Sequence, residues 1–433
     1  MATTTTTTMT TVSPTEHKSF SSHITSLLKF LSSFQGDLAN ATGPPSFLAP
    51  VSVTEVGCCW AQYPRLFSAA AFEPAPEKRA LHVLRWFLSS LRTQLYTGIE
   101  FDKIRNGNGK NTTRGHSIRK PLNAFLGEVF LAEWKDDRAG AKTRLVSEQV
   151  SHHPPITAMH ISDESAGVRA DGYARVEMTF NGAVHVNQVG HAIYRVDRYN
   201  EEYLVPLPDV KVKGFLSGCL YPEITGTYHI LGINGFAAEI KFWGESVLSR
   251  AKRNSFEAKI YRKGDSKKTA IYTVVGCWSE GGWTVKDAKT GQVIEKFDLD
   301  APENQAIPIT LLPVEEQDEW ESRRAWAGVI EGLKTGNLSQ VVEEKSKLEQ
   351  AQRQMRAMEA VRGVTWEPLF FRSCSGEEHE VFRRMVKEWG LEREWKLEGE
   401  RTKGVWRVNE EAVKGLKRPF RKGVSPTGYH ETS

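Results

Sequence analysis

Two adjacent histidines are the most chemically suggestive feature of this sequence. His152 and His153 lie in the string EQVSHHPP, residues 148–155. The prolines that follow restrict the backbone to extended geometry and end a strand's run of hydrogen-bond donors, so we expect both imidazoles at the end of a strand. Imidazoles in such a place can donate hydrogen bonds to phosphate oxygens or ligate a metal.

Metal binding and catalysis gain little support from the residues nearby. Zinc needs three or four ligands at usable spacing, and no local cluster of His, Cys or Glu completes such a set. Ser151 is not in a nucleophile elbow, and no partner for a catalytic triad can be identified. Because a histidine pair is also common as a plain structural or surface feature, a phosphate-binding role and a structural role both stay open here.

Two further groups of polar residues are suited to an anionic ligand. Lys120 and Asn123 lie in the string KPLNAFLGE, just before a predicted strand, and both can donate hydrogen bonds. Lys345, Glu349 and Arg353 stand at i, i+4 and i+8 of a charged helical stretch, so we expect them along one helix face. That spacing is equally typical of salt-bridge pairs on a solvated helix.

An amphipathic helix with a nearly uncharged polar face is predicted from Phe20 to Leu38. Serines fill much of its polar face, Lys29 is the one strong charge before Asp37, and Gly36 is a stop signal. Such a helix can insert into loosely packed lipid, or it can pack its apolar stripe on the domain core. The apolar positions of this segment are Ile24, Leu27, Leu28, Leu31, Phe34 and Leu38.

Composition excludes several classes of protein. Of 433 residues, 39% are hydrophobic and 25% charged, which indicates a soluble chain with a sizeable core. The net charge of +4 is too balanced to indicate nucleic-acid binding. Five cysteines without CxxC spacing predict neither a disulfide framework nor a zinc cage, and they suit a reducing compartment. No apolar run reaches the roughly 18 to 20 residues of a membrane span, and the Thr-rich N-terminus lacks a signal-peptide pattern.

The hydrophobic pattern predicts a long antiparallel meander followed by helices. From about Leu122 to Asp298 the dominant period is two, and turn signals such as Asn181-Gly182 separate neighbouring strands. A meander of this length must curl, so we expect a barrel around a cavity. After Pro313 the pattern becomes helical and highly charged through Glu359, and an irregular tail begins at Trp366.

Three strings together resemble one known family. EQVSHHPP resembles the fingerprint of the oxysterol-binding-protein-related lipid transfer proteins. KPLNAFLGE resembles their KPLNPxLGE string, with Ala124 where proline is usual, and PVEEQDEWESRRAW from Pro313 to Trp326 is similar to the stretch after their barrel. The resemblance runs from about Phe20 to the region of Trp366. The subgroup most similar is the short, lone-domain fungal (Kes-type) one, in which no pleckstrin-homology or ankyrin segment precedes the core.

The resemblance implies an α+β fold: a large incomplete antiparallel β-barrel around a hydrophobic lipid tunnel, with an N-terminal lid helix and a C-terminal helical region. After a disordered stretch at 1–19, it implies a single domain at 20–433. Within that domain we expect the lid at 20–43, an N-terminal helical region at 44–115, the barrel at 116–312 and a C-terminal helical region at 313–433.

The resemblance also implies ligands and binding residues. Sterol and phosphatidylinositol 4-phosphate compete for the tunnel in this family, and the Phe20–Leu38 helix becomes its lid. The implied sterol-binding residues are Trp60, Gln94 and Gln188, although Leu95 replaces a usual tyrosine and Ala174 a usual asparagine. The implied phosphoinositide-binding residues are Lys120, Asn123, His152, His153, Lys345, Glu349 and Arg353.

The expected function is therefore exchange of sterol for phosphatidylinositol 4-phosphate between membranes. We expect no catalysis, no cofactor and no metal, a monomer that binds membranes transiently, and a cytoplasmic location at the Golgi, endoplasmic reticulum or other membranes. Three alternatives stay open. The second lipid can be phosphatidylserine or another non-sterol lipid, the chain can be a lipid-liganded regulator without net transfer, or the histidines can serve a lipid hydrolase.

Overall fold

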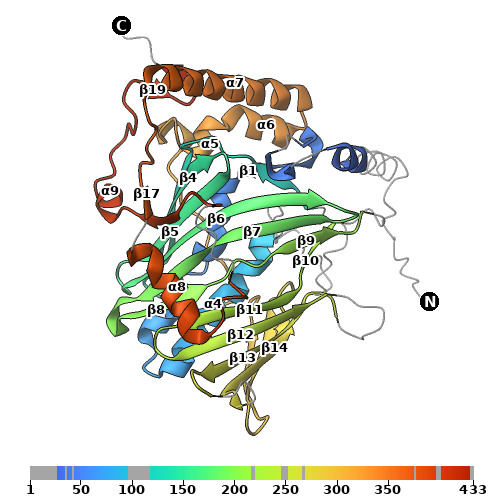
Figure 1. Ribbon diagram of the computed structural model, residues 1–433, viewed down its shortest axis with the longest axis vertical. Helices are drawn as coiled ribbons and strands as arrows, with labels where there is room; N and C mark the ends of the chain where they lie inside the picture. The colour runs from blue at the N-terminus through green and yellow to red at the C-terminus, as the bar shows by residue number, and fades with distance from the viewer. Residues whose placement is uncertain are drawn as a thin grey trace, which may run out of the picture.

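A strongly curved antiparallel sheet forms the centre of the molecule, with helices packed on it and above one end (Figure 1). The structure, a computed structural model, describes residues 27–34, 37–40, 43–95, 118–215, 220–244, 252–265, 269–374, 377–395 and 401–429. Within them, no helix combines the length and the apolar character needed to cross a bilayer.

The central sheet contains 14 strands, ordered β16-β15-β14-β13-β12-β11-β8-β7-β6-β5-β4-β3, with β9 paired to β7 and β10 to β9. The first and last strands of this path do not pair, so the barrel is incomplete, as predicted. The strands are β3 (Val129–Asp136), β4 (Ala141–His152), β5 (Pro155–Asp163), β6 (Val168–Phe180), β7 (Val184–Val196), β8 (Glu201–Val205), β9 (Val210–Lys213), β10 (Tyr221–Ile224), β11 (Gly226–Gly232), β12 (Phe236–Trp243), β13 (Ser255–Arg262), β14 (Tyr272–Cys277), β15 (Gly282–Asp287) and β16 (Val293–Asp298).

The hairpin of β6 and β7 illustrates how sequence alternation builds the barrel wall. Val176 pairs with Gln188 and Met178 with Val186, and these side chains line an internal cavity. The intervening Glu177 lies on the other face, where its carboxylate accepts a hydrogen bond from the Asn187 side chain. Because side chains alternate between the two faces of a strand, the period of two in this segment places every second residue inside the barrel.

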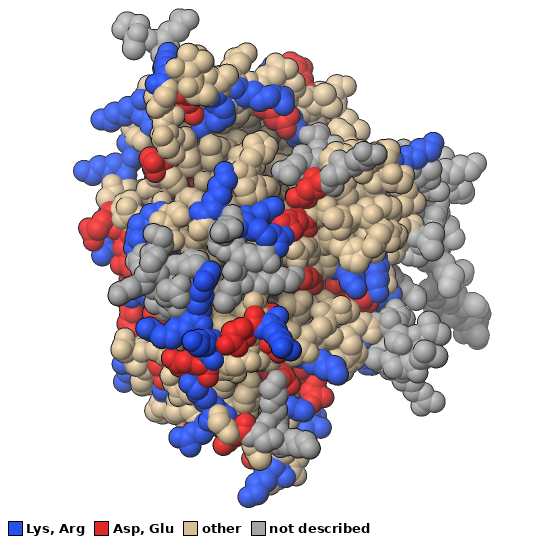
Figure 2. Space-filling view, viewed as in Figure 1, with Lys and Arg blue, Asp and Glu red and all other residues tan. Residues whose placement is uncertain are grey.

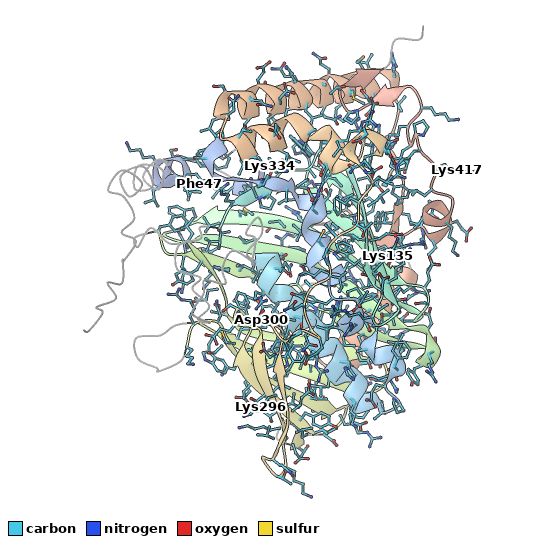
Figure 3. All side chains as sticks on the ribbon, turned by 180° about the vertical axis from the view of Figure 1, so that it is seen from behind. Phe47, Lys135, Lys296, Asp300, Lys334 and Lys417 are labelled. Carbon is cyan, nitrogen blue, oxygen red and sulfur yellow. The ribbon has the colours of Figure 1, made fainter. Side chains whose placement is uncertain are left out.

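Helix α4 (Pro76–Leu95) fills part of the barrel interior by packing against β12 and β13. The ring of Trp86, also on this helix, packs on Phe67 and on Tyr194 of β7. A buried ion pair between Arg79 and Glu201 anchors the N-terminal half of the helix. At the other end, Arg92 pairs with Asp300, which Figure 3 labels from behind. Ion pairs therefore hold both ends of the helix against the rest of the domain.

Short elements precede the barrel. Strand β1 (Leu48–Ser52) pairs in parallel with β2 (Lys120–Leu122), so the region predicted to be helical also contains a strand. The helical pieces are η1 (Leu38–Asn40), η2 (Pro45–Phe47), η3 (Val53–Gly57), α2 (Cys58–Ala61), α3 (Pro64–Ser68) and η4 (Ala69–Phe72), and η6 (Asp197–Tyr199) follows β7.

The region after the barrel is only partly helical. Two small antiparallel sheets, β17–β18 and β19–β20, interrupt the helices that were predicted there, and helix α8 lies between β17 and β18 in the chain. Strands of two to four residues are too short to show a period, which explains why the sequence pattern missed them. The elements are η8 (Val314–Glu316), α5 (Ser322–Ala325), α6 (Ala327–Thr335), α7 (Leu338–Arg362), β17 (Phe371–Cys374), α8 (Glu377–Trp389), β18 (Val405–Val408), α9 (Glu410–Lys414), β19 (Val424–Ser425) and β20 (Gly428–Tyr429).

Two buried glutamates tie this C-terminal region to the barrel. Glu148 accepts hydrogen bonds from the backbone N–H groups of Leu369 and Phe370, at 2.7 and 2.8 Å. Glu128 accepts from the indole N–H of Trp326 at 2.7 Å and from the hydroxyl of Thr54 at 2.8 Å. Both carboxylates belong to the sequence strings noted above, so parts of these strings serve the fold.

Candidate functional site

A cavity of about 340 Å³ lies inside the barrel, and most of its walls are apolar. It is bounded by the lid segment, the β1–β2 pair, the end of α4 and the inward faces of β4 to β7, β9 and β10. Its apolar lining comes from Leu27, Phe30, Leu31, Leu38, Ala39, Pro44, Phe47, Leu48, Val53, Val56, Leu95, Ile118, Pro121, Ala124, Pro155, Met159, Ala174, Val176, Met178, Val184, Val186, Leu207, Val210, Val212, Phe215, Leu220 and Pro222. Figure 3 labels Phe47, which lies close to the lid segment.

Four of the predicted phosphoinositide-binding residues line this cavity together: Lys120, Asn123, His152 and His153. β4 ends at His152, β5 begins at Pro155, and the turn between them contains a cis peptide bond before Pro154. The two imidazole centroids lie 4.8 Å apart, so the turn brings both rings to the same cavity instead of to opposite faces.

The Lys120 ammonium lies at the junction of the cavity and the lid. Its Nζ donates hydrogen bonds to the carbonyl oxygens of Leu38 and Ala39, at 3.3 and 3.2 Å. Burial and the nearby positive charge of Lys345 lower the pKa of Lys120 from 10.5 to about 8, although Asp37 opposes this shift. A nearby negative charge, such as a phosphate, stabilises the charged form of a buried lysine.

Apart from the cations, Asn123 and the histidines, the polar side chains of the cavity are three glutamines and one threonine. Gln94 and Gln188, both predicted to bind sterol, line it, as do Leu95 and Ala174. The Nε2 atom of Gln188 donates to the carbonyl oxygen of Pro208 at 2.6 Å, which fixes the orientation of this amide. The other predicted sterol residue, Trp60, is not among the lining residues. Its ring packs edge-on against Trp86 in the core, where it is 2% exposed.

The lid segment closes one side of the cavity. Residues 27–33 are helical, and Leu27 and Leu31 are buried in a cluster with Leu38, Phe215 and Leu220. Leu28 and Phe34 pack against the same cluster without lining the cavity. Ile24, the sixth predicted lid position, lies outside the described residues.

The predicted stripe on α7 does not line the cavity. Lys345 is buried and contacts the carboxylate of Glu349, whereas Arg353 is exposed. A step of four residues turns about 40° beyond a full helical turn, so a stripe at i, i+4 and i+8 winds away from the buried face. Two members still act on the cavity through charge. Lys345 adds to the lowering of the Lys120 pKa by burial, and Glu349 opposes part of the lowering of the His152 pKa by burial and by His153.

Several lining residues were not predicted from the sequence. Arg119 adds a cation beside Lys120, and Gln149 and Thr157 add polar groups on β4 and β5. Thr157 donates to Gln149 at 2.6 Å, and the Gln149 amide donates to the Ser151 carbonyl at 2.9 Å. Strand alternation could have identified Thr157 and Met159 as inward-facing, but nothing in the pattern distinguishes a residue that lines a cavity from one in a filled core.

The geometry suits an elongated amphiphile better than a catalytic reaction. Two cations and two imidazoles line the cavity together with many apolar side chains, and one of these cations, Lys120, contacts the lid. The described part of the chain contains no group of three or more His, Cys, Asp or Glu residues arranged to hold a metal ion. On the face shown in Figure 2, acidic and basic side chains are interspersed, consistent with the small net charge.

Comparisons with known proteins support the resemblance. A family model described as "Oxysterol-binding protein" matches residues 26–329. "Probable transporter efuK" of Hormonema carpetanum is 39% identical over 92% of this chain, but the chain spans only 54% of that relative. "Protein kes1" of Schizosaccharomyces pombe is 36% identical over 80% of this chain and 85% of its own length.

Solved structures share the fold. The Osh1 ORD domain in complex with cholesterol matches with a TM-score of 0.63 and 21% identity, over 90% of this chain and 87% of that one. The Osh3 ORD of Saccharomyces cerevisiae in complex with PI(4)P matches with a TM-score of 0.60 and 20% identity, over 86% of this chain and 95% of that one. These matches confirm the predicted fold class.

Proposed function

Because this chain belongs to the oxysterol-binding protein family, we propose that it binds one sterol or one phosphatidylinositol 4-phosphate in its lidded cavity and exchanges the two between membranes. The observation that carries the proposal is one cavity that combines apolar walls with Lys120, Asn123, His152 and His153 in its lining. Since both lipids require the same volume, binding of one excludes the other.

The headgroup residues have the chemistry that a phosphate monoester requires. Such a phosphate carries close to two negative charges at neutral pH, and each charge-assisted hydrogen bond contributes about 1.5 to 3 kcal/mol. Lys345, Glu349 and Arg353 remain proposed headgroup residues. The electrostatic effects of Lys345 on Lys120 and of Glu349 on His152 support the first two. Trp60 remains a proposed sterol residue, acting through the core behind the cavity.

The proposal also covers catalysis, oligomeric state and location. Exchange by competition requires no covalent step, so we do not assign an enzymatic activity. One cavity per chain suffices, so we propose a monomer that contacts membrane surfaces transiently. The proposed setting is the cytoplasm, with peripheral association at Golgi, endoplasmic reticulum or other membranes.

The test is extraction of lipid from vesicles. Purified protein is mixed with phosphatidylcholine vesicles that contain labelled phosphatidylinositol 4-phosphate, with or without ergosterol, and the soluble complex is quantified. We expect close to one phosphoinositide per chain and its displacement by the sterol. If neither lipid is extracted, the proposed function is wrong while the fold stands.

A second candidate retains the phosphoinositide but replaces sterol with another lipid, such as phosphatidylserine. The apolar Leu95 and Ala174 in the cavity favour it, because they offer no hydrogen bond to a sterol hydroxyl. Ala174→Asn discriminates the two. For a sterol carrier we expect the sterol affinity of this variant to rise, by up to about tenfold for one hydrogen bond. In the extraction test on the unchanged chain, phosphoinositide that sterol cannot displace favours the non-sterol lipid.

A third candidate, a lipid-liganded regulator, is distinguished by rate. A transfer protein moves lipid between vesicle populations many times per chain, whereas a regulator binds the same lipids without significant net transfer.

A further inference from the structure

The segment that follows the lid helix, residues 37–40 (called the hinge below), is held at two points. At the first, the Asp37 carboxylate accepts hydrogen bonds from the backbone N–H groups of Ala39 and Met178, both at 2.8 Å. Met178 belongs to β6, so this contact docks the hinge on the barrel wall. At the second, the Lys120 ammonium donates to the carbonyl oxygens of Leu38 and Ala39.

Lys120 belongs to the hinge and to the ligand cavity at once. It is the first residue of β2, it lines the cavity with Asn123, and in this closed arrangement it donates to two lid carbonyls. These acceptors are neutral. A phosphate oxygen is a stronger acceptor for an ammonium than a neutral carbonyl, because the hydrogen bond joins two charges. The lid carbonyls and an anionic ligand therefore compete for hydrogen bonds from the Lys120 ammonium.

We propose that Lys120 is a lid latch: it holds the hinge closed over an empty cavity or a neutral lipid, and an anionic headgroup loosens the hinge by drawing the ammonium away from the Leu38 and Ala39 carbonyls. The identity of the anionic ligand rests on the proposed function, but the latch itself does not. With this latch, how readily the lid opens depends on the bound lipid, and the lid of a phosphoinositide complex opens more readily than that of a neutral-lipid complex.

Hydrogen exchange of two backbone amides tests the latch directly. The N–H groups of Ala39 and Met178 both donate to Asp37, so their protection reports hinge docking. In the lipid-free full chain, we expect Lys120→Met to speed their exchange on the order of tenfold, the effect of losing one charged hydrogen bond. Arg119→Met is the matched control, because it removes a neighbouring cation that lines the same cavity. Among the described residues no hydrogen bond joins the Arg119 side chain to residues 37–40, so this variant should leave the exchange unchanged.

Lipid loading tests the coupling. Wild-type protein is loaded from phosphatidylcholine vesicles containing either phosphatidylinositol 4-phosphate or cholesterol. We expect faster exchange of the Ala39 and Met178 amides in the phosphoinositide complex than in the cholesterol complex.

The outcomes separate the latch from the proposed function. Unchanged exchange in lipid-free Lys120→Met overturns the latch, whatever lipids the protein binds. Equal or slower exchange in the wild-type phosphoinositide complex overturns the coupling. If no phosphoinositide is taken up, the proposed function fails, while the lipid-free comparison still decides whether Lys120 holds the hinge.

Discussion

The Nδ1 atom of His152 lies 3.1 Å from the carbonyl oxygen of Ala124. Because a carbonyl oxygen only accepts, Nδ1 carries the ring proton and the neutral ring keeps its lone pair at Nε2. Desolvation by the surrounding protein and the neighbouring His153 hold the pKa of His152 below 6.5. Nε2 therefore becomes a donor to phosphate only when the ring gains a proton, which couples phosphate binding to proton uptake.

The double variant His152→Ala with His153→Ala should lose phosphoinositide extraction and largely keep sterol binding. Each lost charge-assisted hydrogen bond weakens binding by at least about tenfold, whereas a sterol has no phosphate to contact. Extraction of both lipids from vesicles measures the difference. An equal loss of both lipids, together with a lower melting temperature, would instead assign the pair to folding.

Phosphoinositide affinity should fall as pH rises from about 8 toward 10. The pKa of Lys120 is lowered to about 8 in the free protein, and a bound phosphate raises it again, so binding takes up a proton above pH 8. One linked proton changes the affinity by up to about tenfold per pH unit. Extraction measured across this range checks the slope. Lys120→Met should bind weakly at every pH and show a smaller slope, because only the proton uptake at His152 remains. An unchanged slope in the variant contradicts the assignment to Lys120.

Glu148 should make the protein less stable as pH rises from about 5 to 7.5. Burial raises its pKa from 4.5 to about 7, so the folded chain binds this proton more tightly than the unfolded chain. Its contribution is therefore complete below pH 4.5 and is lost as pH rises through about 7, by roughly 3 kcal/mol in all. Denaturant unfolding at several pH values measures the free energy of unfolding.

Two Glu→Gln variants test this prediction, one at Glu148 and one at an exposed control position. Glu148→Gln should destabilise the chain, because one of the Leu369 and Phe370 N–H groups loses its acceptor, and should reduce the decline with pH. Glu164→Gln, at a position 77% exposed in its side chain, should keep the wild-type decline. An identical pH profile in wild type and Glu148→Gln would refute the role of this carboxylate.

Leu31→Asp should speed the loss of a bound lipid. Leu31 is 8% exposed within the lid cluster, and burial of a leucine contributes about 1.5 to 3 kcal/mol, which corresponds to roughly ten- to hundredfold in rate. Dissociation of a fluorescent sterol into acceptor vesicles measures this rate. Ser32→Asp places the same charge on the exposed side of the same helix and should leave it unchanged. Equal rates in both variants would mean that the stripe is ordinary core packing.

Local pattern predicted the elements of this protein well, because it reflects interactions between residues close in sequence. The period of two marks β6 at Val168–Phe180, and the Asn181-Gly182 turn joins it to β7, as the structure shows. The same reasoning failed for β1 and for the two small C-terminal sheets, whose strands are too short to show a period.

The sequence by itself determined the family, the strand-rich barrel and the residue types of a phosphate site, since these follow from motifs and alternation. Only the tertiary structure decided that Leu31, Gln94, His152 and Gln188 line one cavity, that Trp60 packs against Trp86, and that Lys120 holds the lid carbonyls. Such contacts join segments far apart in the chain, and the curvature of the sheet and the packing of α4 set their distances. A local sequence pattern contains no information about either.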